Sequence, residues 1–230
     1  MTREAYTQPS PAALMLLSGG LDSVTALAWA LKQGYSITTA LSFTYGQQHI
    51  REVAAARAVA HYYDLHHEVI DLSPIRGSRL TNLGNIPQQR DLASLDEDIA
   101  PTYVPNRNMI FLSYAAAHAL LGPLSILIGG WNAADALNYP DCRDEFLTAT
   151  EHTLHLATRR SFSIIRPLIA DDKPTIVRRA LALDVPIHLT WTCYLGGEAA
   201  CGTCDACQLR LAAFRTCGVV DPIPYTIHVE

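Results

Sequence analysis

The stretch ALMLLSGGLDS, residues 13–23, decides the fold. Its apolar part, residues 13–17, predicts a buried strand, and apolar residues at helical spacing over 22–32 predict a helix directly afterwards. The intervening SGGLDS, residues 18–23, therefore turns the chain from a strand into a helix N-terminus. Glycines there let the backbone approach an anion, while N–H groups of the first helical turn and serine hydroxyls can donate hydrogen bonds to it. The full pattern predicts a phosphate-binding loop, whereas a bare glycine pair would fit a simple tight turn equally well.

The hexapeptide has neither the GxxxxGK[ST] nor the GxGxxG spacing, so it indicates neither the common triphosphatase loop nor a dinucleotide fold. It resembles the pyrophosphate loop of the N-type ATP pyrophosphatases, which activate a carboxyl or amide oxygen by adenylation. The resemblance implies a doubly wound parallel sheet of five strands, of the adenine nucleotide hydrolase-like class, with Asp22 near the phosphates and their magnesium. The residues that it assigns to ATP are Leu17, Ser18, Gly19, Gly20, Leu21, Asp22, Ser23 and Val24.

In the rest of the chain, segments with the pattern of a strand alternate with segments with the pattern of a helix. We expect further strands at 36–43, 67–72, 124–129 and 163–165, and further helices at 47–63, 107–121, 144–158, 175–183 and 205–214. Strands this apolar, alternating with helices, predict a parallel sheet covered on both faces. Residues 73–106 carry four prolines and predict a long functional loop or lid.

Composition narrows the class of protein. Of 230 residues, 49% are hydrophobic and 17% are charged, which supports a packed core and excludes a disordered chain. A net charge of −5 argues against a basic face that binds nucleic acid. No apolar stretch approaches the roughly 20 residues that span a bilayer, and the N-terminus lacks the order of a secretory signal. We expect a cytoplasmic protein with small-molecule partners, no membrane contact and a loose leader at 1–12.

Four cysteines crowd together near the end of the sequence: Cys193, Cys201, Cys204 and Cys207. Four thiolates that converge tetrahedrally make a closed structural zinc site, which has no open position for catalysis. CxxCxxC also begins an iron–sulfur run, but Leu211 stands where that run would carry its next cysteine. We therefore expect one structural zinc per chain. The expected domains are an ATP-binding domain at 13–185 and, at 186–230, a zinc-binding tail that includes the closing helix.

Three further stretches carry a more specific resemblance: FTYGQQH at 43–49, VPNRNMIFLS at 104–113 and YPDCRDEF at 139–146. Together with the loop and the cysteines, they resemble the 7-cyano-7-deazaguanine synthase family of queuosine biosynthesis, from about residue 13 to 215. The resemblance implies an ATP-dependent ligase that forms carbon–nitrogen bonds. Its substrates would be 7-carboxy-7-deazaguanine and ammonia, and an adenylated acid and an amide would lead to the nitrile. A homodimer is implied by the resemblance alone.

Candidate catalytic and substrate residues follow from the same stretches. The candidate cations for the phosphates are Arg107, Arg143 and Lys173; Gln47 and His49 are candidates for the ammonia or nucleobase side; and Asp135 or Asp141 could accept N–H groups of a guanine-like edge. Duller interpretations stand beside these. Arg143 and Lys173 could equally be exposed charges, and Asp141 could equally cap a loop. For His49, a structural role is favoured over a catalytic one.

The sequence departs from the family pattern around the expected base pocket, for example at Trp131, Asn138 and Ala200. These departures leave the nitrogen acceptor open. One alternative is a related enzyme that adenylates a deazaguanine-type acid and passes it to a different amine, for instance on a protein. A second is a tRNA-modifying adenylating enzyme, against which the negative net charge argues.

Overall fold

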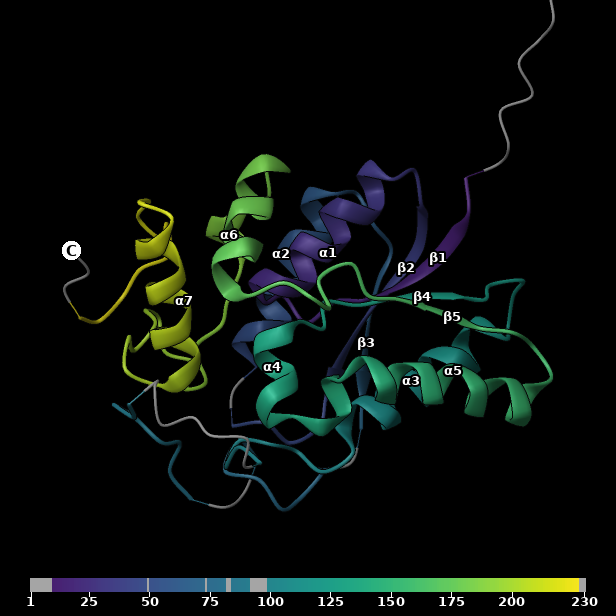
Figure 1. The fold of residues 1–230 in the computed structure, drawn as a ribbon, viewed down its shortest axis with the longest axis horizontal. Helices are drawn as coiled ribbons and strands as arrows, with labels where there is room; N and C mark the ends of the chain where they lie inside the picture. Colours follow the sequence, from purple (N-terminus) through teal and green to yellow (C-terminus); the bar gives the residue numbers. More distant parts are fainter. Residues whose placement is uncertain (1–9, 49, 73, 82–83, 92–98, 228–230) are drawn as a thin grey trace, which may run out of the picture.

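The computed structural model describes residues 10–48, 50–72, 74–81, 84–91 and 99–227. Five strands form one parallel sheet in the order β3-β2-β1-β4-β5 (Figure 1). The strands are β1 (Ala12–Leu16), β2 (Ser36–Thr44), β3 (His67–Asp71), β4 (Ile126–Ile128) and β5 (Ser163–Ile165). The predicted five-stranded parallel α/β sheet is confirmed.

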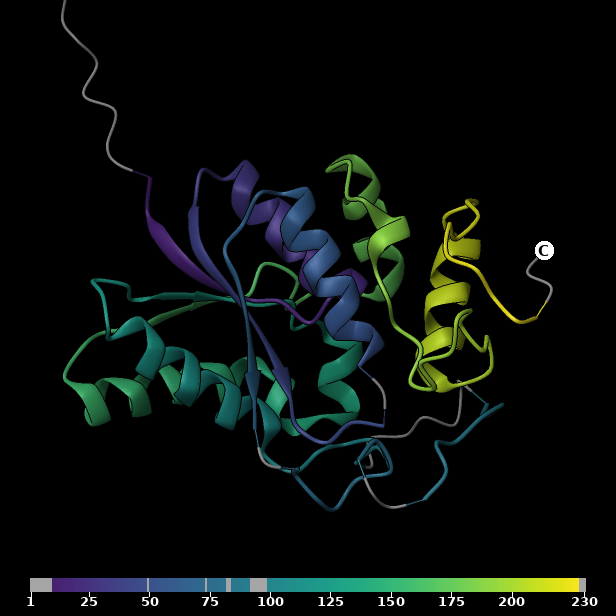
Figure 2. The same ribbon diagram turned by 180° about the vertical axis from the view of Figure 1, so that it is seen from behind.

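Alternate residues of the central strand β1 enter two different cores. Leu14 packs in the core that contains Leu112 and Leu147, whereas Ala13 and Met15 pack in the core that contains residues of α1, α2 and α6. Figures 1 and 2 show α1, α2 and α6 on one face of the sheet and α3 and α5 on the other. The helices are α1 (Leu21–Lys32), α2 (Arg51–Tyr62), α3 (Arg107–Ala119), α4 (Ala133–Asn138), α5 (Asp144–Thr158), α6 (Lys173–Ala182) and α7 (Asp205–Thr216). Both faces are therefore covered, as a doubly wound fold requires.

Some element boundaries differ from those expected. Helix α2 begins at Arg51 rather than at Gln47, because Gln47 accepts a hydrogen bond from the Tyr45 N–H (2.7 Å) and donates one to the Phe43 carbonyl (3.2 Å). These bonds hold a turn at the end of β2. Strand β1 starts at Ala12, inside the expected leader, of which residues 1–9 lie outside the described residues. Helix α4 was not expected at all.

The backbone makes two close approaches where the strand order reverses around β1. Gly19 has φ +86°, and a Cβ there would stand 2.4 Å from the carbonyl oxygen of Glu52 in α2. A Cβ on Gly130, after β4, would stand 2.6 Å from the N of Ser23 in α1. In sheets of this kind the crevice at such a reversal receives the ligand. The glycines thus bring α1 and α2 against the strand ends.

The segment between β3 and α3 and the cysteine-rich tail lie against each other. Gln88 bridges to Cys204, the N–H of Gln89 donates to the carbonyl of Thr203 (2.8 Å), and Arg90 pairs with Asp205 (3.1 Å). Helix α7 packs in turn against α6. The tail therefore holds the long segment beside the carboxyl ends of the strands.

A buried ion pair fastens the end of the tail to α7. Arg210 donates to both carboxylate oxygens of Asp221, at 2.6 Å and 2.9 Å, and only 3% of its side chain is exposed. Asp221 also accepts a hydrogen bond from the Tyr225 hydroxyl (2.7 Å). Because both charges are withdrawn from water, each depends on its partner.

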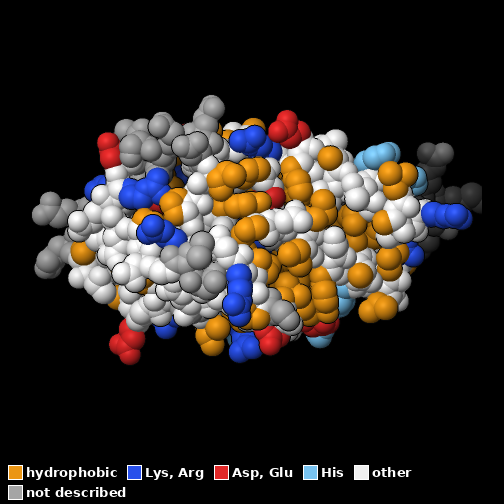
Figure 3. All heavy atoms as spheres, turned by 90° about the horizontal axis from the view of Figure 1, so that it is seen from below, with side chains coloured by type: hydrophobic (Ala, Val, Ile, Leu, Met, Phe, Trp, Pro, Cys, Tyr) orange, Lys and Arg blue, Asp and Glu red, His pale blue; other side chains and the backbone are white. Residues whose placement is uncertain are grey.

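The outer surface offers no single basic region on the face drawn in Figure 3. Hydrophobic side chains form a band across the middle of that face, and the Lys and Arg side chains stand in separate groups. Within the described parts of the chain, no helix is both long and apolar enough to cross a membrane.

Gly19→Ala tests the close approach of the loop to α2. We expect the free energy of unfolding to fall by about 2–4 kcal/mol, since alanine is strained at this φ and its Cβ would overlap backbone. Gly122→Ala is the control, because a Cβ there meets nothing within 4 Å, and it should change stability by less than about 1 kcal/mol. Urea unfolding measures both, and equal effects would contradict the packing described.

Asp221→Ala tests the buried pair. It leaves the Arg210 guanidinium without its carboxylate, so the free energy of unfolding should fall by about 3–5 kcal/mol. The matched control is Glu145→Ala, which removes an exposed pair with Arg143 at 4.0 Å and should cost about 1 kcal/mol or less. A small loss for Asp221→Ala in chemical denaturation would show that the pair is not what fastens the tail.

Candidate functional site

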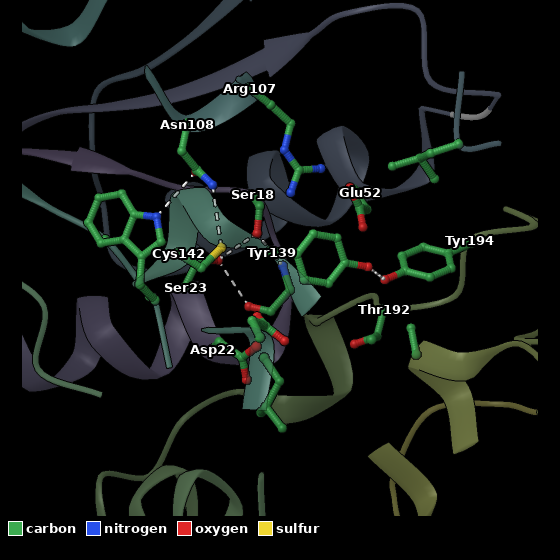
Figure 4. A pocket seen from close by; sticks show the side chains of 18 of the residues that line it. Ser18, Asp22, Ser23, Glu52, Arg107, Asn108, Tyr139, Cys142, Thr192 and Tyr194 are labelled. Atoms are coloured by element: carbon green, nitrogen blue, oxygen red, sulfur yellow. Dashed lines mark hydrogen bonds between the residues drawn. The ribbon is translucent and has the colours of Figure 1, made fainter. Parts of the chain in front are cut away.

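A cavity of about 520 Å³ opens at the carboxyl ends of the strands (Figure 4). Its walls come from the loop at 18–23, the first turns of α2 and α3, the turn after β4, helices α4 and α7, and the long segment before α3. Elements far apart in the sequence thus surround one space. That volume falls in the range of small-molecule sites.

The loop at 18–23 presents a helix N-terminus to this cavity. The Ser18 and Ser23 hydroxyls lie 3.0 Å apart, and the N–H of Gly20 donates to Ser18 Oγ (3.2 Å). Gly20 is the N-cap of α1, and no described side chain caps that end. The N–H groups of the first turn therefore remain available for an anion. Of the residues that the resemblance assigns to ATP, those that line the cavity are Leu17, Ser18, Gly20, Leu21, Asp22 and Ser23, whereas Gly19 packs on α2 and Val24 lies in the core.

Lys173, the first residue of α6, lies between two carboxylates at the loop end of the cavity. Its Nζ is 2.8 Å from Asp22 and 3.0 Å from Asp135. Asn132, which is fully buried, donates to Asp22 (3.2 Å) and to Asp135 (2.9 Å), and its Oδ1 caps α4. The structure therefore brings Asp22, Asp135 and Lys173 together beside the loop at 18–23.

Burial and charge oppose each other in this cluster. Burial raises the pKa of Asp22, and the Asp135 carboxylate adds to the rise, while Lys173 works against it. For Lys173, burial lowers the pKa, but the attraction of Asp135 and Asp22 outweighs burial and leaves the pKa above its ordinary value. Lys173 therefore stays charged at neutral pH, next to the loop.

Arg107 and Glu52 lie on the other side of the cavity from Asp22 (Figure 4). Arg107 opens α3 and donates to the Tyr45 hydroxyl (3.1 Å), which fixes its guanidinium. Glu52 stands in the first turn of α2 and lines the cavity. Burial raises the pKa of Glu52 to about 7, although Arg107 lowers it. This end thus holds one fixed cation and one carboxyl group that ionises near neutrality.

A third part of the cavity is apolar. Phe43 and Phe111 stack with ring centroids 4.2 Å apart and planes 7° from parallel. Trp131 also lines the cavity and donates from Nε1 to the Asn108 Oδ1 (3.2 Å), and Asn108 in turn donates to the Cys142 sulfur (3.4 Å). Aromatic walls with a few fixed polar groups suit a planar heterocycle.

Of the remaining candidate residues, some line the cavity and others lie outside its lining. Gln47 lines the cavity, although both ends of its amide are bonded to backbone. Arg143 lies outside the lining and donates to the Ala136 carbonyl (3.0 Å). Asp141 is buried and accepts from the Asn108 N–H (2.9 Å), a capping contact at the start of α3. His49 lies outside the described residues.

A hydrogen-bonded pair of tyrosines joins the cavity to the cysteine-rich tail. The Tyr139 hydroxyl lies 2.7 Å from Thr102 Oγ1 in the long segment and 3.4 Å from the Tyr194 hydroxyl (Figure 4). Burial raises the pKa of both tyrosines, so their hydroxyls keep their protons. Tyr194 follows directly after Cys193. Through Tyr194, the cysteine-rich tail therefore contacts the cavity wall at Tyr139.

The four cysteines predicted as ligands come together. Their four sulfur atoms all lie within 4.8 Å of one another, and the sulfur atoms of Cys201 and Cys207 are 3.9 Å apart. A tetrahedral zinc with Zn–S bonds of about 2.3 Å needs sulfurs about 3.8 Å apart. Backbone N–H groups of Leu195 and Cys201 approach the Cys193 sulfur at 3.4 Å. The donor set therefore fits a tetrahedral metal ion.

Three residues of the site, Asn132, Gly130 and Glu52, were missed from the sequence. Asn132 and Asp135 have the N-cap spacing of a helix start, a signal that could have revealed α4 and the cap. Gly130 and Glu52 gave no local signal. The contact of Gly130 depends on α1 lying beside it, and the place of Glu52 depends on α2 packing on the loop at 18–23.

Comparison with known proteins agrees with this geometry. The family described as "Queuosine biosynthesis protein QueC" matches residues 12–218. A 7-cyano-7-deazaguanine synthase of Thermoplasma volcanium is 45% identical over 225 residues, covering 95% of this chain and 92% of that protein. The synthase of Thermoplasma acidophilum is 47% identical over 220 residues, covering 93% and 91%. That of Thermosynechococcus vestitus is 46% identical over 227 residues, covering 94% and 96%.

A solved structure shares the fold at low sequence identity. The NMN synthetase of Francisella tularensis is similar with a TM-score of 0.53 at 19% identity, over 92% of this chain and 79% of that one. That likeness concerns the fold alone, whereas the curated relatives match nearly the full length of the chain. The chain belongs to the QueC family of queuosine biosynthesis proteins, as the five sequence stretches had indicated.

Proposed function

We propose that this protein converts 7-carboxy-7-deazaguanine and ammonia to 7-cyano-7-deazaguanine at the expense of ATP. The observation that carries the proposal is the uncapped start of α1 at 18–23, which faces a cavity beside the charged Lys173. That combination suits a polyphosphate. The aromatic part of the same cavity suits the planar ring of a deazaguanine acid. Membership in the QueC family supplies the substrate class.

The proposed reaction activates an oxygen twice. A carboxylate is a poor electrophile, so its oxygen attacks the α-phosphorus of ATP, and pyrophosphate leaves. Ammonia then displaces AMP and gives the amide. The amide oxygen attacks a second ATP, and loss of AMP with the nitrogen protons gives the nitrile. In each activation negative charge grows on the leaving pyrophosphate, where preorganised N–H groups and a fixed cation act best.

Residues of this chain divide that work. The N–H groups at the start of α1, with Ser18 and Ser23, bind the pyrophosphate portion, and Lys173 neutralises its charge. Asp22 and Asp135 offer the oxygen ligands that magnesium prefers, and magnesium bound there would neutralise the phosphates further. Arg107, on the other side of the cavity, binds the acyl or α-phosphate oxygens.

The cysteine cluster holds one structural zinc in this proposal. With four thiolates the ion has no open position, so its part is to fold the tail. The contacts of Gln88 and Arg90 with that tail then place the long segment over the cavity. Zinc therefore supports the site at a distance and takes no part in the chemistry.

The turnover experiment incubates the protein with 7-carboxy-7-deazaguanine, ATP and ammonium, and identifies products by mass. We expect the nitrile together with AMP and pyrophosphate, since the loop is suited to a departing pyrophosphate. Accumulation of only adenylate or amide would instead favour the related enzyme that serves a different amine. ADP with phosphate would contradict the adenylation route.

Metal analysis of the purified protein should find one zinc per chain. Cys207→Ser should reduce the zinc content below half, because it removes one of four thiolates, and should lower thermal stability. Cys217→Ser is the matched control, since Cys217 lies outside the cluster beside the Pro174 carbonyl. Iron with a visible absorption band would support the iron–sulfur alternative and contradict zinc.

A further inference from the structure

The backbone of Glu52 is fixed against the loop at 18–23, and its side chain lines the cavity across from Asp22 (Figure 4). Glu52 lies in the first turn of α2, and its own carbonyl oxygen is the atom that a Cβ on Gly19 would meet at 2.4 Å. Its side chain lines the cavity together with Arg107 and Ser18, as Figure 4 shows. The packing of α2 on the loop therefore determines where this carboxyl group stands.

The Glu52 carboxyl group is uncommitted within the described part of the protein. It accepts no hydrogen bond and forms no ion pair there, whereas Asp22 and Asp135 both contact Lys173. Arg107, the cation whose charge Glu52 feels most, directs a hydrogen bond to Tyr45 instead. A carboxylate that faces a cavity without a partner has its lone pairs free for a ligand.

The other titratable groups that line the cavity are poorer proton acceptors. Asp22 and Asp135 are held by a lysine. Asp205, which also lines the cavity, is paired with Arg90 at 3.1 Å, and its other oxygen is buried. Burial raises the pKa of Tyr45 and of Cys142, so both keep their protons at neutral pH. Glu52, whose pKa burial raises to about 7, exchanges a proton readily at the pH of the cell. It is the best placed base among the described cavity residues.

The proposed reaction needs such a base more than once. After ammonia attacks the acyl adenylate, the nitrogen carries a positive charge and must lose a proton before the C–O bond to AMP breaks. In the dehydration, the adenylated amide must lose both of its nitrogen protons as the C–O electrons leave with AMP. Proton transfer by a positioned side chain contributes about 10²–10⁴-fold in rate.

We propose that Glu52 is the catalytic base that removes protons from the substrate nitrogen. The inference rests on the proposed function. In the amide step the carboxylate takes one N–H proton from the tetrahedral adduct, whose oxyanion then re-forms the C=O bond as AMP leaves with the C–O electron pair. In the dehydration it takes an N–H proton as the nitrogen electrons form a further C–N bond and AMP leaves with the C–O electron pair. Glu52 then releases the proton to water and is ready for the next removal. Oxygen activation, by contrast, needs no proton acceptor and belongs to the loop and Lys173.

The test separates the two halves of the reaction. Acid-dependent exchange of labelled pyrophosphate into ATP reports adenylation alone, and amide formation from ammonium reports the nitrogen step. For Glu52→Gln, which keeps the shape and removes the basic oxygen, we expect exchange within about twofold of wild type. Amide formation should fall about 100-fold or more. Glu145→Gln, at an exposed acid on α5, is the matched control and should leave both rates unchanged.

Two further measurements distinguish a base from a structural residue. Hydroxylamine is uncharged at neutral pH and less demanding of a base, so Glu52→Gln should form the hydroxamate within about fivefold of wild type. Glu52→Asp should recover part of the ammonia-dependent rate. Equal losses of exchange and amide formation, or no loss of either, would overturn the proposal for Glu52. Absence of acid-dependent exchange in the wild type would overturn the proposed function itself.

Discussion

The site depends on one steric constraint, the backbone contact of two glycines with two helices. Gly19 lies against the carbonyl of Glu52, and Gly130 lies against the backbone of Ser23, both at distances that a side chain would prevent. These contacts press the first turns of α1 and α2 onto the ends of β1 and β4, where the sheet order reverses. As a result, the N–H groups of α1 and the carboxyl group of Glu52 share one cavity. Loss of either approach would separate the uncapped first turn of α1 from the groups around it.

A second level of organisation closes the cavity from outside the sheet. The long segment before α3 contributes part of the wall, yet its described residues have little regular structure of their own. It is held by Gln89 and Arg90, which bind Thr203 and Asp205 of the cysteine-rich tail. The tail is in turn fixed to α7 by a buried ion pair and converges on four sulfurs. A metal ion in that cluster would therefore act on the cavity through the loop contacts rather than through its own chemistry.

The parts that sequence predicted are those that local patterns determine. The strand at 13–17 and the helix after Asp22 follow from periodicity, and the four cysteines follow from spacing. The start of α2 was placed too early, because the side chain of Gln47 bonds to the backbone and stops the helical pattern there. The position of Asp135 beside Lys173 could not be read locally either. That contact joins residues from α4 and α6, whose meeting depends on the packing of the whole sheet. The signal for α4 was present in Asn132, but a six-residue helix leaves little periodicity to detect.

The distribution of charge across the cavity explains how one site could serve two unlike steps. At the loop end, Asp22 and Asp135 hold the lysine in place and keep it charged, so this end favours the departure of an anion. At the opposite end, Glu52 has no such partner among the described residues, and burial keeps its pKa near neutrality. A direct ion pair would hold Glu52 ionised and weaken it as a base, whereas the ion pairs with Asp22 and Asp135 keep Lys173 charged. In the proposed reaction, keeping the two carboxylate environments apart would let oxygen activation and nitrogen deprotonation proceed in the same cavity without interfering.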